Sequence, residues 1–169
     1  MLLSATIQSA PPFINKDVIF SYPHSIALCK AAECGYQEIV KLLMQEGADL
    51  NAVDKDGNTP LHKAVEGGYL GIASLLIQKG AKVNAVDRYG HTPLHKAASK
   101  GYLGTASLLI EKGADLNAVD KDGNTPLHKA AKEGYLELIR LLLEKGAKVN
   151  GKNKAGEIPK EIARKRGHI

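Results

Sequence analysis

One segment of this chain recurs at a fixed interval. DKDGNTPLHKA occupies residues 54–64 and again 120–130, and the variant DRYGHTPLHKA lies between them at 87–97, so each copy begins 33 residues after the previous one. Columns of glycine and asparagine follow the same interval: Gly68, Gly101 and Gly134; Gly47, Gly80, Gly113 and Gly146; Asn51, Asn84, Asn117 and Asn150. A period of this length indicates a solenoid built from stacked supersecondary units.

Each copy predicts two short helices joined by a turn. Thr59 is placed to cap the first helix, and Pro60 suits its first position because no N–H is needed there. The glycines at 67–68 should end this helix, and a second helix should begin near Tyr69 and end before Gly80. The apolar residues expected to be buried on the second helix are Leu70, Ala73, Leu75, Leu76 and Ile77.

The segment AKVNAVDRYGH, residues 81–91, links one copy to the next. It carries Asn, Asp and Gly without a helical period, so we expect an extended turn that projects from the stack. Two such short helices cannot bury their apolar faces alone, and neighbouring copies must therefore cover them. Gly71 and Gly104 lie inside the second helices, where a glycine costs about 1 kcal/mol relative to alanine. Nothing in the sequence explains them.

The combined pattern D-x-x-G-x-T-P-L-H-x-A, then G-x-x-x-x-x-x-L-L, then G-A-x-[LV]-N resembles the ankyrin repeat. The resemblance covers residues 54–150 without a gap and extends at lower quality from about 21 to 169. It implies an all-α repeat solenoid, an ankyrin-type stack of helix-turn-helix units with projecting β-hairpin-like turns. The expected organisation is an N-terminal extension, flexible or loosely docked (1–20), an N-terminal capping repeat (21–53), three full repeats (54–86, 87–119 and 120–152) and a partial C-terminal capping repeat (153–169).

The terminal copies depart from the pattern in ways that suit capping repeats. In IALCKAAECGY, residues 26–36, Ile26 replaces the threonine and Cys29 replaces the histidine. Cys29 should therefore lack the turn hydrogen bonds that the resemblance implies for the histidines. We interpret it as a small buried hydrophobic residue, with a reactive thiol as the alternative. The segment AGEIPKEIARKRGHI, residues 155–169, offers one helix with a charged exterior, as a capping repeat requires.

The repeated histidines, His62, His95 and His128, raise the question of a metal or catalytic site. Packed helices lie roughly 8–10 Å apart, whereas a zinc ion needs its histidine nitrogens at about 2 Å, so one ion cannot be shared. The resemblance implies instead that each histidine bonds backbone groups of the turns and ties adjacent copies together. DKDGN is not an EF-hand either, because Ala52 and Lys63 would stand where carboxylates are required.

No other pattern points to catalysis. The glycines of GGYLG, residues 67–71, follow no strand and lack the G-x-G-x-x-G spacing, and G-x-x-x-x-G-K-[ST] does not occur. No nucleophile, base and oxyanion donors are brought into one pocket. We therefore expect no catalytic site, no metal site, no cofactor and no enzyme activity.

The composition bears on compartment and partner class. The net charge of +5 is dispersed along the chain, so we expect no nucleic-acid partner. Two cysteines near each other, without a disulfide framework, favour a reducing compartment, and no apolar run is long enough to span a bilayer. The N-terminal segment lacks a basic region and carries two prolines, which favours an extension over a secretion signal. We expect a monomeric cytoplasmic protein, or one delivered into a host cell by a pathogen.

The resemblance implies a non-enzymatic module that binds a partner protein through its concave face and turn tips. Two basic columns favour an acidic segment on that partner. They are Lys30, Lys63, Lys96 and Lys129, and Lys55, Arg88, Lys121 and Lys154. The third tip, Arg88-Tyr89-Gly90-His91, also brings residue types that are enriched at interface hot spots. The alternative is sequence drift at a permissive turn. The candidate contacts are Lys55, Asp56, Lys63, Arg88, Tyr89, His91, Lys96, Ser99, Lys100, Lys121, Lys129 and Lys132.

Three alternatives remain open at this stage. The basic columns can form a solvated surface that neighbouring aspartates neutralise. The protein can also be a structural or self-associating repeat spacer without a dedicated ligand, since the middle copies are nearly identical and a surface tuned to one ligand should differ between layers. Finally, the chain can be the binding part of a secreted effector.

Overall fold

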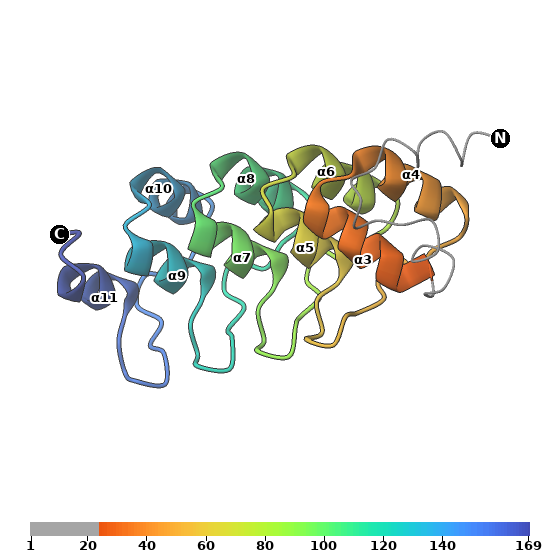
Figure 1. The fold of residues 1–169 in the computed structure, drawn as a ribbon. Helices are drawn as coiled ribbons and strands as arrows, with labels where there is room; N and C mark the ends of the chain where they lie inside the picture. Colours follow the sequence, from red (N-terminus) through yellow and green to blue (C-terminus); the bar gives the residue numbers. More distant parts are fainter. Residues whose placement is uncertain (1–23) are drawn as a thin grey trace. The chain divides into compact units, whose positions relative to one another are not determined.

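The structure, a computed structural model, describes residues 24–169, and these residues contain nine helices and no strand. The chain divides into two compact units, Met1–Lys82 and Val83–Ile169. Figure 1 labels the helices. The expected extension at residues 1–20 lies outside the described residues.

Unit 1 contains two helix pairs. Helix α3 (His24–Cys34) pairs with α4 (Gln37–Gln45), and α5 (Pro60–Glu66) pairs with α6 (Leu70–Gln78). The first helices α3 and α5 pack side by side, and the second helices α4 and α6 also meet. The unit is therefore two layers deep, with one layer of first helices and one of second helices.

Unit 2 repeats this arrangement and ends in a single helix. Its pairs are α7 (Pro93–Lys100) with α8 (Leu103–Glu111) and α9 (Pro126–Glu133) with α10 (Leu136–Glu144), and α11 (Pro159–Lys165) follows. Helix α9 packs between α7 and α11, while α8 packs against α10. Both units are thus stacks of ankyrin-type helix pairs, and the predicted all-α fold class is confirmed.

The first helices begin where the Thr-Pro pairs predict. The hydroxyl oxygen of Thr59 accepts a hydrogen bond from the backbone N–H of His62 at 3.3 Å, and the N–H of Thr59 donates to Nδ1 of His62 at 3.1 Å. This reciprocal pair is a capping box in which histidine takes the place usually held by Glu or Gln. The same pair recurs at Thr92–His95 and Thr125–His128.

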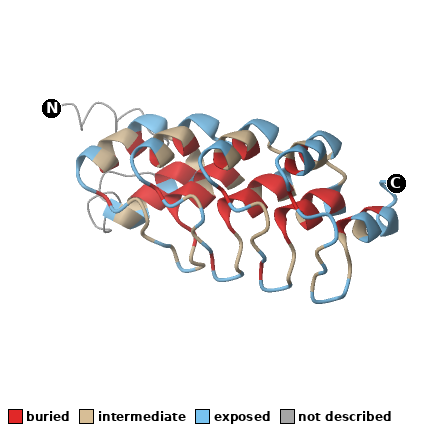
Figure 2. Ribbon diagram, turned by 180° about the vertical axis from the view of Figure 1, so that it is seen from behind, coloured by how far each residue is buried: buried red, intermediate tan, exposed pale blue. Residues whose placement is uncertain are grey.

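The second helices bury a narrower face than the sequence predicts. On α6 the buried residues are Ile72, Ala73 and Leu76, whereas the side chain of Leu70 is 45% exposed. At about 100° per residue, Leu70 lies roughly a third of a turn from the centre of the buried face. The prediction that Leu70 is buried is therefore wrong, and Leu75 and Ile77 are only half-buried. Ile72 is buried although the sequence pattern did not indicate it. Figure 2 shows the buried residues of each unit on the inward faces of its helix pairs.

Candidate partner-binding surface

Each turn tip is held by one buried or half-buried carboxylate or amide. In the third repeat, Oδ1 of Asp87 accepts hydrogen bonds from the backbone N–H groups of Tyr89 and His91, both at 2.9 Å. Gly90 has a φ of 79°, a left-handed conformation that suits glycine. Equivalent bonds are made by Asp54, Asp120 and Asn153. The acids of the repeated motif therefore shape the turn.

Consecutive tips of unit 2 are joined through their backbones. The N–H of Lys121 donates to the carbonyl oxygen of Tyr89 at 2.9 Å, and the N–H of Lys154 donates to that of Asp122, also at 2.9 Å. The tips form a hydrogen-bonded row without being assigned as strands in the described residues. This row fixes the spacing at which tip side chains can meet a partner.

The histidines link neighbouring repeats within unit 2. Nε2 of His95 lies 2.8 Å from the carbonyl oxygen of Asn124, and Nε2 of His128 lies 3.1 Å from that of Glu157. Since Nδ1 accepts the capping N–H, the proton sits on Nε2 and is donated to the next tip. Burial lowers the pKa of His95 to about 4 and also lowers the pKa of His128. The structural role expected for the histidines is therefore present.

Cys29 occupies the same position in the first repeat. Its sulfur lies 3.7 Å from the carbonyl oxygen of Ala52 and 3.8 Å from that of Asn58. The expectation that Cys29 makes no turn hydrogen bond is therefore corrected: its single S–H is shared weakly between these two carbonyl oxygens, because the thiol points at the tip that the histidines contact in other repeats. Burial, followed by the charge of Asp54, raises the pKa of Cys29 to about 12. Such a thiol is unreactive, which argues against the alternative of a reactive cysteine.

The first basic column, termed the inner column, consists of Lys30, Lys63, Lys96 and Lys129. Lys30 pairs with Glu33, and the other three lysines pair with tip aspartates. Nζ of Lys96 lies 3.2 Å from Oδ2 of Asp87, and Nζ of Lys129 lies 2.7 Å from Oδ2 of Asp120, whose side chain is 1% exposed. Lys63 lies 3.3 Å from Asp54 in the same way. Burial raises the pKa of Asp120, but bonds from Lys129 and from backbone N–H groups outweigh it, so that the pKa is lowered. These lysines hold the tips and present little uncompensated charge.

The second basic column, termed the outer column, consists of Lys55, Arg88, Lys121 and Lys154, and all four side chains are exposed. Lys55, Lys121 and Lys154 are exposed, and within the described part of the chain none of them forms an ion pair. Arg88 lies over the ring of Tyr89, with its guanidinium carbon 4.7 Å from the ring centre, and bonds the Tyr89 hydroxyl. Lys55, Lys121 and Lys154 therefore face solvent.

Two of the three contacts predicted at the third tip are exposed, whereas the third, His91, points inward. The side chain of Tyr89 is 46% exposed, and Arg88 is exposed beside it. His91 points inward instead, where Nδ1 lies 3.4 Å from Asp87 and Nε2 lies 3.3 Å from Asp120. The ring of His91 therefore lies between two tip carboxylates.

The remaining predicted contacts lie on the first helices and the second tip. Ser99 donates its hydroxyl proton to the carbonyl oxygen of His95 at 2.9 Å within α7. Lys100 and Lys132 are exposed in the last turns of α7 and α9, and Asp56 is partly exposed. Lys100 and Lys132 therefore face solvent on the first-helix layer.

A basic hollow that the sequence reasoning missed lies between α9, α11 and two tips. Its volume is about 330 Å³, and its lining includes Asn124, Lys132, Asn153, Glu157, Lys165 and Arg166. Glu157 pairs with Lys165. The charge run of the last segment is the sequence signal for these residues, but by itself it indicates only a charged exterior. The packing of α11 on α9 brings the run beside Lys132.

Within residues 24–169, no group of three or more His, Cys, Asp or Glu residues is arranged to hold a metal ion. Neither does any helix of this segment reach the length and apolar character needed to cross a bilayer. The exposed basic and tip residues are thus the candidate functional features of the described chain.

Comparisons with known proteins agree with this geometry. A family model described as ankyrin repeats (3 copies) matches residues 13–87 and 83–153. Protein phosphatase 1 regulatory subunit 12A of Mus musculus is 42% identical over 60 residues, which is 33% of this chain and 6% of that protein, and the Rattus norvegicus protein matches equally. An ankyrin repeat protein of fowlpox virus (strain NVSL) is 40% identical over 48 residues, 28% of this chain and 34% of the viral protein.

This chain therefore spans only a small part of the phosphatase subunits that it matches. The family model, by contrast, covers most of the chain in two overlapping blocks. The repeated capping boxes, the glycine turns and the histidine links between layers are the structural counterpart of that match. The chain belongs to the ankyrin repeat family.

Proposed function

We propose that this protein is a non-enzymatic binding module that docks an acidic segment of a partner protein on the first helices and turn tips of unit 2. The observation that carries the proposal is the basic hollow between α9 and α11. Lys132 and Arg166 contribute two positive charges that no ion pair among the described residues compensates. The amides of Asn124 and Asn153 add polar groups at the same place.

Charge is the basis of the predicted specificity. Of the three cations that line the hollow, Lys165 is compensated by Glu157, so the excess charge lies on the other two. A carboxylate of the partner would find two cations and amide donors together. Such an interface speeds association and is weakened by salt.

The predicted contact residues divide into two groups in this proposal. Lys63, Lys96 and Lys129 stabilise the tips through their aspartates. Direct contact falls to exposed residues, with Arg88 and Tyr89 as the aromatic and cationic anchor on the third tip. The other direct contacts are Lys100, Lys121 and Lys132, all in unit 2. Lys55 and Asp56 belong to unit 1 and are not part of this surface.

Two further observations support a binding role. Ankyrin repeats are protein-interaction modules, and the mammalian relatives carry the name of a regulatory subunit. A cytoplasmic location, or delivery into a host cell, is part of the proposal. The second candidate is a repeat spacer without a ligand, which the near-identity of the repeats favours.

Affinity capture from a lysate of the source cell tests the proposal. The wild-type chain is compared with a variant that carries Lys100→Glu, Lys132→Glu and Arg166→Glu. A control variant carries Lys112→Glu, Lys145→Glu and Lys148→Glu, which change the net charge equally but lie at the ends of the second helices and in the links. All three proteins must show the same thermal melt by circular dichroism.

The expected result is a protein that wild type and control retain and that the first variant loses. Its retention should also fall as the salt concentration rises. Equal loss with both variants would show nonspecific charge attraction and would contradict the proposed surface. If wild type retains no protein, the spacer is favoured.

A further inference from the structure

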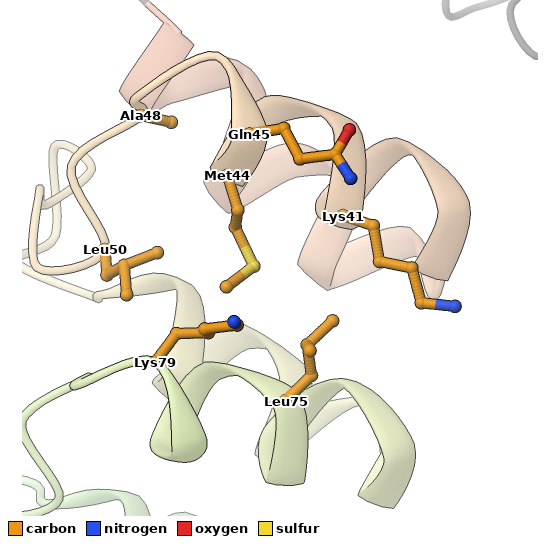
Figure 3. A pocket seen from close by; sticks show the side chains of 7 residues that line it. All are labelled: Lys41, Met44, Gln45, Ala48, Leu50, Leu75 and Lys79. Atoms are coloured by element: carbon orange, nitrogen blue, oxygen red, sulfur yellow. The ribbon is translucent and has the colours of Figure 1, made fainter. Parts of the chain in front are cut away.

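An apolar groove lies on the other layer of unit 1, between the second helices α4 and α6. Its volume is about 550 Å³. Met44, Ala48 and Leu50 line one side and Leu75 the other, while Lys41 and Lys79 stand at its edges. Figure 3 shows Met44 and Leu75 directed toward each other across the groove, with Lys79 reaching between them and Lys41 pointing outward. None of these residues belongs to the first helices or tips of the proposed binding surface.

The lining of this groove differs from the equivalent positions of later repeats. Lys41, Met44 and Gln45 correspond to Ser107, Ile110 and Glu111, which lie two intervals of 33 residues further along the chain. Methionine is unbranched and flexible, so its thioether can move to admit an apolar side chain. Isoleucine is branched at Cβ and held in few rotamers, so it cannot adapt in this way. The first repeat thus carries an adaptable apolar floor that the later copy lacks.

The charges at the edge of the groove are positive and weakly compensated. Lys79 forms no ion pair within residues 24–169. Lys41 lies 2.9 Å from Glu38, but both side chains are largely solvent-exposed, at 42% and 68%. An exposed pair of this kind contributes little. A ligand that carries acidic residues beside an apolar side chain would complement both lysines.

We propose that this groove is a second docking site, which binds an amphipathic segment of a partner protein with an apolar anchor flanked by Asp or Glu. The anchor packs against Met44 and Leu75 and displaces the side chain of Lys79, which reaches between them in this structure. The acidic residues of the partner then meet Lys41 and the displaced Lys79. A short helix fits this description because residues three and four apart place the anchor and the acids on one face. The site lies on α4 and α6, and it stands or falls independently of the basic hollow in unit 2.

The test uses the full chain and short random peptides displayed on phage. Phages are first depleted on a variant with Lys41→Ser, Met44→Ile and Gln45→Glu, which gives the groove the side chains that the third repeat carries. They are then selected on the wild-type chain. Each new residue is the one found at the equivalent helix position of the third repeat, so the fold should tolerate it. An unchanged thermal melt must confirm that the variant folds.

Methionine methyl signals locate the bound peptide. The chain has two methionines, Met1 and Met44, so selective methyl labelling gives two NMR signals, and the Met44→Ile variant assigns them. The expected peptides are apolar with an excess of Asp and Glu. They should shift the Met44 signal. Their Kd for the triple variant should be about tenfold higher than their Kd for the wild-type chain.

Several results would overturn the proposal. These are a selection that yields no enriched peptide, enriched peptides without an acidic excess, or binding that leaves the Met44 signal unmoved. A Met44 shift that follows protein concentration, together with a dimer in sedimentation, would show that a second copy occupies the groove instead. If the Lys132→Glu and Arg166→Glu substitutions abolish binding of a selected peptide, that peptide binds the basic hollow. This result would also refute the second site.

Discussion

The sulfur of Cys29 lies 3.8 Å from the carbonyl oxygen of Asn58. At the equivalent position of a later repeat, Nε2 of His95 lies 2.8 Å from the carbonyl oxygen of Asn124. A thiol and an imidazole thus serve the same joint between repeats, one weakly and one strongly. The N-terminal repeat is fastened with less polar bonding than the repeats of unit 2.

The thiol chemistry of the two cysteines should differ sharply. Because burial raises the pKa of Cys29 from 9.0 to about 12, its thiolate fraction at pH 8 is about a thousandfold smaller than that of an ordinary thiol. Titration of the native chain with a chromogenic disulfide should therefore detect one fast thiol, Cys34, and the denatured chain should show two. In the Cys34→Ser variant no fast thiol should remain. A fast thiol in that variant would show that Cys29 is accessible.

Stability should fall as the pH is lowered from 7 to 5. Burial lowers the pKa of His95 from its ordinary value of 6.5 to about 4 in the folded chain, so the unfolded chain binds more protons in this window. The contribution is complete above pH 6.5 and is lost as the pH falls toward 4. The free energy of unfolding should drop by about 2 kcal/mol between pH 7 and 5, and His128 acts in the same direction.

Urea denaturation followed by circular dichroism measures this effect. A His95→Gln variant should be less stable at pH 7 and should show a shallower pH dependence between 7 and 5. Replacement of the exposed His168 by Gln is the control and should leave the pH slope unchanged. Equal slopes for all three proteins would mean that the buried imidazole is not the titrating group.

Substitutions at Asp120 should separate the two roles of the tip carboxylate. Asp120→Asn keeps an acceptor oxygen for the turn, as Asn153 does naturally. It removes the negative charge that faces Lys129 and His91, at a cost of about 1 kcal/mol. Asp120→Ala loses both the acceptor and the charge and should cost about 3 kcal/mol. The exposed Asp122→Ala should change the free energy of unfolding by less than about 0.5 kcal/mol. Chemical denaturation gives all three values, and an equal loss for Asn and Ala would disprove a turn-forming role.

The glycines inside the second helices should be replaceable with a gain in stability. Gly104→Ala should stabilise the chain by about 1 kcal/mol, because alanine favours the helix and position 104 is exposed. Gly71→Ala should gain less, since its new Cβ would lie 2.8 Å from Oε1 of Gln37, which must move. Gly101→Ala should destabilise, because φ is 72° there and the ring of Tyr135 lies 2.8 Å from the Cβ position. The urea midpoints of the three variants show whether each substitution stabilises or destabilises the chain. A loss of stability in Gly104→Ala would contradict the prediction.

Local patterns determined much of this protein. The Thr-Pro pairs fix the starts of the first helices, because a cap and a first-turn proline act within four residues. The glycines after the second helices, such as Gly80 with a φ of 102°, fix their ends. The fixed interval then requires stacking, since no single helix pair can bury its own apolar face. Fold class follows from these short-range rules. The structural role of the histidines is implied by the family resemblance, and the bonds from His95 and His128 to the next tips bear it out.

Other features depend on which side chains meet across layers, and only the tertiary structure decided them. The inner lysine column is compensated because Lys96 reaches Asp87 across a folded tip, nine residues away in sequence. His91 turns inward because Asp120, from the next tip, lies within reach of its ring. The basic hollow exists because α11 packs beside Lys132, and the groove exists because Met44 faces Leu75. A repeat pattern specifies the spacing of layers, but charge compensation and cavities arise from contacts between residues that the pattern treats as independent.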